Sequence, residues 1–150
     1  MRAERFDVRV TAWHGFAALA ASAALGLASL TATTFASPGV SVRTSPSVGH
    51  SILVDDRGMT LYRYTEDQTG TSACYAGCAV AWPPVIVDTV PAVDNAAVAQ
   101  GLGTSGRTDG TTQLTYLGQP LYYYVGDTKP GDITGDASDG VWYVVDAPAA

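Results

Sequence analysis

The chain carries one short pattern twice, at a constant spacing of 60 residues. The segments GMTLYRYTED, from Gly58, and GQPLYYYVGD, from Gly118, share the pattern G-x-x-L-Y-x-Y-x-x-D, and in both copies a tryptophan stands 15 residues after the aspartate. Two copies are too few for a solenoid, which needs about three or more repeats. The pattern therefore predicts two half-domains, at about 50–90 and 104–146, that share one core. The repeated residues are Tyr62, Tyr64, Asp67 and Trp82, and then Tyr122, Tyr124, Asp127 and Trp142.

Each copy of the pattern predicts a β-hairpin. SILVDDRGMTLYRY and TTQLTYLGQPLYYYV both place two apolar or alternating stretches around a turn that contains glycine. PPVIVDT, which follows Trp82, and VWYVVDA, which contains Trp142, are rich in β-branched and aromatic residues, as strands are. DNAAVAQG predicts one short helix ending at Gly101. The expected fold is all-β: a small β-sandwich or barrel-like domain over residues 50–147, with one short helix.

The motif tyrosines are expected to share a face within each strand. Side chains alternate between the two faces of a strand, so Tyr62 lies on the same face as Tyr64, and Tyr122 on the same face as Tyr124. Tyrosine combines an apolar ring with a polar tip, so such a face suits a ligand-stacking surface as well as a core. The spacing favours core packing, and a tyrosine-rich binding face is the alternative.

Residues 1–36 have the features of a secretory signal peptide. A basic start precedes an unbroken small and apolar stretch, which ends in Thr34-Phe35-Ala36 before Pro38. The stretch approaches the roughly 20 residues that span a bilayer, so an uncleaved N-terminal anchor is the alternative. Its alanines and glycine make it weakly hydrophobic and favour cleavage. No cysteine follows the stretch to carry a lipid. We therefore expect a secreted protein that begins with a flexible segment over residues 37–49.

Removal of residues 1–36 leaves an acidic chain. Five basic and 12 acidic residues remain, for a net formal charge of −7. This balance opposes binding to nucleic acid and to anionic membrane surfaces. The expected partner is instead an unidentified small ligand or a component of the cell envelope.

The two cysteines of the chain, Cys74 and Cys78, stand four residues apart in TSACYAGCAVAWPP. Gly77 between them permits the turn that a disulfide requires, and paired cysteines outside the cytoplasm usually oxidise. Two alternatives stay open: thiol–disulfide exchange, or a Cu(I) site completed by His50 or Met59. At the 60-residue offset the second copy has no cysteine at either position, so whatever the pair does is confined to the first copy.

The second copy contains an acidic, glycine-rich loop, GDTKPGDITGDASDG. Its carboxylates Asp132, Asp136 and Asp139 are candidate ligands for Ca²⁺. The match to a calcium loop is poor, because Ala137 replaces the turn glycine and Tyr143 stands where a bidentate glutamate is needed. Aspartates that cap backbone N–H groups in turns are therefore favoured, and no metal or other cofactor is expected.

Catalysis is not expected, and no catalytic residue is assigned. Asp67 and Asp127 could form the carboxylate pair of a glycosidase, but each closes a strand where aspartate commonly caps a turn. His50 is the one histidine that remains after signal removal, and neither a phosphate loop nor a nucleotide fingerprint is present.

Residues from about 50 to 146 resemble a bacterial family of secreted repeats, predicted lipoproteins with a Tyr-x-aromatic-x-x-Asp motif. The motif stands here at residues 62–67 and 122–127. The activity of that family is unknown, and the lipid-bearing cysteine of its name is absent here. We therefore expect a non-catalytic secreted or cell-surface module that binds through a tyrosine-rich face and its Gly/Asp loops. The alternative is an extracytoplasmic thiol-redox or Cu(I)-handling protein that uses Cys74 and Cys78.

Overall fold

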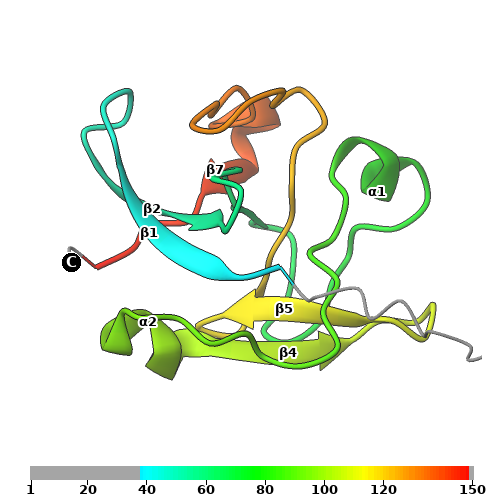
Figure 1. The fold of residues 1–150 in the computed structure, drawn as a ribbon. Helices are drawn as coiled ribbons and strands as arrows, with labels where there is room; N and C mark the ends of the chain where they lie inside the picture. The colour runs from blue at the N-terminus through cyan, green and yellow to red at the C-terminus, as the bar shows by residue number, and fades with distance from the viewer. Residues whose placement is uncertain (1–37, 149–150) are drawn as a thin grey trace, which may run out of the picture. The chain divides into compact units, whose positions relative to one another are not determined.

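The computed structural model describes residues 38–148, so the expected signal peptide at 1–36 lies outside the described residues. Figure 1 shows a domain built mainly from short strands. The helices are α1 (Gly77–Ala81), α2 (Ala96–Gly101) and the 3₁₀-helix η1 (Ser138–Gly140). Within residues 38–148, no helix is long and apolar enough for a membrane span. The strands are β1 (Val40–Ser45), β2 (His50–Asp55), β3 (Tyr62–Tyr64), β4 (Leu102–Gly106), β5 (Thr112–Tyr116), β6 (Gln119–Pro120) and β7 (Trp142–Val144).

The strands form small antiparallel sheets, which confirms the all-β prediction. The pairs β1–β2 and β3–β7 form one sheet each, and a third sheet has the order β4–β5–β6. The segment after Trp82, predicted as a strand, lies alongside the third sheet: Val85 donates to Leu121 and accepts from Leu114 through backbone bonds of 2.9 and 2.8 Å. The helix predicted to end at Gly101 is α2, whereas α1 was not predicted.

Residues 40–45 form an ordered strand, so the expectation of a flexible segment over 37–49 was wrong there. β1 pairs with β2 along its whole length, from Val40 opposite Asp55 to Ser45 opposite His50. The alternation of Val40 and Val42 with polar residues is a strand pattern, and Val40 is buried in the core.

The turns of the two hairpins are built differently. After β2, the buried Asp55 carboxylate accepts the backbone N–H groups of Arg57 at 3.0 Å and Met59 at 2.9 Å. Between β5 and β6, Leu117 and Gly118 both have positive φ, 50° and 78°. A two-residue hairpin turn of this kind matches the twist of its strands, but Leu117 adopts there a conformation that favours glycine and asparagine.

Two apolar clusters make up the core, and each contains residues of both halves. One joins Leu53 and Leu61 of the first half to Leu114 and Leu121 of the second. The other holds the motif tyrosines and tryptophans together with Cys74. Leu61 and Tyr62 belong to different clusters, as the alternation of side chains along a strand requires.

Candidate functional site

Tyr62 and Tyr122, equivalent residues of the two copies, lie directly opposite each other. Each donates its backbone N–H to the carbonyl of the other, and both N···O distances are 2.9 Å. They form an isolated antiparallel bridge. An exchange of this kind between equivalent residues relates the two copies by a local pseudo-twofold axis.

The side chains of the motif cross between the copies. Tyr62 Oη donates to Asp127 Oδ2, and Tyr122 Oη donates to Asp67 Oδ2, each at 2.7 Å. The second oxygen of each aspartate accepts a backbone N–H from its own loop, that of Ala73 for Asp67 at 2.7 Å. Asp127 accepts the corresponding bond from Thr134, at 2.9 Å. The aspartate of each copy therefore accepts the buried tyrosine hydroxyl of the other copy. The sequence did not predict that these side chains lie close together.

Burial raises the pKa of three groups of this centre, Tyr62, Tyr122 and Asp67. Removal from water raises the pKa of the Tyr62 and Tyr122 hydroxyls well above the ordinary value for tyrosine. The acceptor aspartates also raise it, whereas the bond with Ser72 lowers the pKa of Tyr122. Burial also raises the pKa of the Asp67 carboxyl, although bonds from Ala73 and Tyr122 oppose that shift. The two tyrosines thus stay protonated donors at neutral pH, as structural hydrogen bonds require.

Four aromatic rings form a continuous stack across the pseudo-twofold axis. Tyr64 stacks on Trp142 at 4.2 Å between centroids, Trp142 on Trp82 at 4.0 Å, and Trp82 on Tyr124 at 4.3 Å. Tyr62 meets the stack edge-on at Trp82. Stacked and edge-on pairs are both favourable ring geometries.

The repeat motif therefore lies in the interior rather than on a binding face. Tyr62 and Tyr122 are 0% exposed, and Trp82 and Trp142 are buried. Tyr64 and Tyr124 reach the surface in part. A ligand cannot stack on Tyr62 or Tyr122, so the tyrosine-rich face is wrong for those two residues.

A disulfide joins Cys74 to Cys78, whose Cα atoms are 5.2 Å apart. The bridge closes residues 74–78 and overlaps the start of α1, and residues 74–81 are called the disulfide loop below. Cys74 is completely buried. Within residues 38–148, no three Cys, His, Asp or Glu side chains gather as a metal site. His50 instead pairs with Asp146, at 2.7 Å. The copper and thiol-exchange alternatives are not favoured.

Arg107 supports the disulfide loop from the interior. Its role was not identified from the sequence. Its buried guanidinium donates to the Cys74 carbonyl at 2.9 Å, to Ser72 Oγ at 2.9 Å and to Gln113 Oε1 at 2.7 Å. The ring of Tyr75 lies 4.3 Å from it in a cation–π contact. Arg107 stands in the turn-rich segment GTSGRTDGTT, where no apolar pattern signals burial.

Two carboxylates of the acidic loop in the second copy accept backbone N–H groups. Asp132 accepts the backbone N–H groups of Thr128 at 3.0 Å and Lys129 at 3.1 Å, and Asp136 accepts that of Val144 at 3.0 Å. Asp139 lies in a left-handed conformation within η1. The bonds of Asp132 fit the turn interpretation, whereas Asp136 ties the loop to strand β7.

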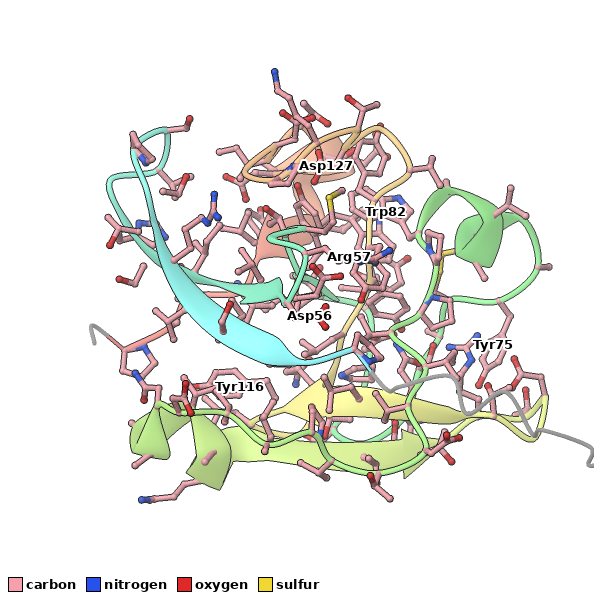
Figure 2. The ribbon with its side chains drawn as sticks, viewed as in Figure 1. Asp56, Arg57, Tyr75, Trp82, Tyr116 and Asp127 are labelled. Atoms are coloured by element: carbon pink, nitrogen blue, oxygen red, sulfur yellow. A yellow bond between two sulfur atoms is a disulfide. The ribbon has the colours of Figure 1, made fainter. Side chains whose placement is uncertain are left out.

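The disulfide loop presents an apolar tip to solvent. None of the residues of α1 is buried, and Val80 is 75% exposed. Val125, 57% exposed, lies beside the end of α1, because its N–H donates to the Ala81 carbonyl at 3.1 Å. Figure 1 shows α1 on a loop that projects from the strands, and Figure 2 shows Trp82 at the inner side of that loop.

Comparison with protein families matches residues 49–86 and 103–146, the two copies of the repeat, to a lipoprotein family described as a secreted repeat of unknown function. That description supports an extracytoplasmic location. Comparison with curated proteins gave no match, and comparison with solved structures gave none. Since the two matched segments cover more than half of the chain, this protein belongs to the family of secreted repeats of unknown function.

Proposed function

We propose that this protein is a non-catalytic secreted module that binds an uncharged, apolar component of the cell envelope through its disulfide loop. The observation that carries the proposal is the exposure of Val80, at 75%, on a helix that buries none of its residues. A disulfide and a buried arginine fix a loop in which Cys78, Ala79 and Ala81 pack partly against the core, while Val80 points to solvent. Fixing a loop in advance lowers the entropy lost on binding.

Charge supports an uncharged partner. Residues 68–87, which include the whole disulfide loop, contain no charged side chain, whereas residues 37–150 carry a net charge of −7. The matching loop of the second copy has Lys129 and several aspartates. The two copies thus keep the same core residues and differ in the loops that they display.

The absence of a role in catalysis is part of the proposal. The motif aspartates are each engaged by a tyrosine of the other copy and by backbone N–H groups. His50 is bonded to Asp146 on the surface. Neither arrangement provides an accessible acid, base or nucleophile in a cleft.

Binding of the full secreted protein to cell envelopes of its own source tests the proposal. A charge at the tip should be costly to bury, so Val80→Asp should lower the bound fraction about tenfold or more. The matched control is Val90→Asp, which adds the same charge at an exposed valine outside the disulfide loop. Equal binding by the two variants, or no binding by the unaltered protein, would overturn the proposal.

A further inference from the structure

The outer edge of β1 has unpaired backbone groups. On the edge of β2 that faces away from β1, the Leu53 N–H donates to the Val145 carbonyl at 2.9 Å, and the Ser51 carbonyl accepts from the Ala147 N–H at 2.9 Å. Backbone groups alternate in direction along a strand. The N–H and C=O groups of Ile52, which lies between Ser51 and Leu53, therefore point towards β1. Ile52 lies opposite Arg43.

The same alternation fixes which groups of β1 point outward. Ser41, Arg43 and Ser45 are bonded towards β2, so the N–H and C=O groups of Val42 and Thr44 point away from the sheet. No backbone group of the described residues bonds to them. An open edge of this kind accepts another extended strand.

An apolar groove of about 610 Å³ runs beside this edge. Its wall on one side is β1, with Val42 half-buried, and on the other side the segment that leads into α2. Asn95 fixes that second wall, because its side chain accepts the N–H groups of Ala97 and Val98. Figure 2 shows the buried Tyr116 between β1 and α2. The lining residues are Val40, Ser41, Val42, Val93, Asp94, Asn95, Ala96 and Ala97.

The groove carries one acidic charge. Asp94 is the one charged residue among the described lining residues; Asp56, whose N–H donates to Gly39 just before β1, lines a second hollow together with Arg57. The one basic residue of β1, Arg43, directs its guanidinium towards Gly58 and Gly131 instead. An occupant of this edge should therefore carry lysine or arginine.

We propose that β1 docks an extended peptide segment of a partner protein, one that alternates apolar and basic residues. The peptide pairs its backbone with Val42 and Thr44, places an apolar side chain in the groove and sets a basic one near Asp94. This surface is separate from the disulfide loop, so either proposal can fail without the other.

A synthetic probe tests the edge directly. The probe is the acetylated and amidated peptide Lys-Val-Thr-Val-Lys-Thr, added to the full secreted protein. Amide hydrogen exchange at Val42 and Thr44 should slow about tenfold or more when the peptide binds, while exchange at Ser41 and Arg43, already bonded to β2, should change little. Binding without slower exchange at Val42 and Thr44, or no binding, would overturn the proposal.

Two variants separate backbone pairing from charge. Val42→Pro removes an outward N–H and leaves the bonds to β2 in place, so it should weaken peptide binding about tenfold or more. Asp94→Asn should weaken it about threefold at low salt, while Asp139→Asn, the same charge change in another loop, should have no effect. A homodimer of the free protein that Val42→Pro dissociates would overturn the proposal, because a second copy would then occupy the edge.

Discussion

At the residue scale, the motif Tyr-x-Tyr-x-x-Asp is explained by the bonds that its side chains make. Tyrosine supplies a ring for the stack and a hydroxyl that reaches the aspartate of the other copy at 2.7 Å. The aspartate in turn fixes its own loop by accepting a backbone N–H. Phenylalanine would keep the ring and leave a buried carboxylate with one partner fewer, which costs more than the bond itself contributes.

Leu117 is a residue that does not suit its backbone conformation. It is 71% exposed with φ at 50°, followed by Gly118 at φ 78°. Asparagine tolerates this conformation far better, and Asn-Gly is a preferred pair for such a turn. Leu117→Asn should raise the free energy of unfolding by about 1 kcal/mol, as measured by urea denaturation. Leu117→Ala keeps the unfavourable backbone and should give no gain; an equal gain from both variants would contradict the assignment.

The sequence predicts the burial of some residues and misses that of others. Alternation placed Leu61 and Tyr62 on opposite faces, and they belong to different clusters, because that rule depends on neighbours in the chain. The burial of Arg107 could not be predicted in the same way. Its partners Ser72 and Cys74 are 35 and 33 residues away, and nothing in its own segment marks it as internal.

At the element scale, the disulfide loop is the part in which the copies differ most. Gly77–Ala81 form a helix of five residues, too short to be stable alone. The disulfide, the Arg107 bond to the Cys74 carbonyl and the contact with Tyr75 hold it in place. The sequence did not predict α1 because five residues are too few for a helical apolar pattern, and its most apolar side chain, Val80, is exposed.

Removal of the disulfide should loosen this element and leave the core intact. A short closed loop contributes about 2 kcal/mol in the chain-entropy description, so Cys74→Ala combined with Cys78→Ala should lower the free energy of unfolding by about that amount. The near-ultraviolet circular dichroism of the stacked tryptophans should be preserved. If the folded variant lost that signal, the bridge would be supporting the aromatic stack as well as the loop, and the prediction would be wrong.

Strand β1 shows how local pattern and tertiary context combine. Val40-Ser41-Val42 has strand alternation, yet the repeat begins after it, so no partner strand could be predicted for it. β2 supplies that partner through a turn in which Gly49 donates to the Ser45 carbonyl at 2.9 Å. Strands that lie outside a repeat are missed when the repeat alone defines the domain.

At the scale of the whole molecule, the described residues are held together across the pseudo-twofold axis. Both core clusters take residues from both copies, and the crossed tyrosine–aspartate bonds span 65 and 55 residues of sequence. The repeat predicted a shared core. The direct pairing of Tyr62 with Tyr122 could not be predicted, since a constant offset in sequence does not fix how two copies are oriented.

A double-mutant cycle tests this crossing most directly. Tyr62→Phe and Asp127→Asn, measured singly and together by urea denaturation, should show a coupling of about 1 kcal/mol or more, because the two groups share a buried bond. The control cycle combines Tyr62→Phe with Asp67→Asn, two changes within one copy. The side chains of Tyr62 and Asp67 share no hydrogen-bond partner. Their coupling should be within about 0.5 kcal/mol of zero. Strong coupling within the copy, and none between the copies, would contradict the crossed arrangement.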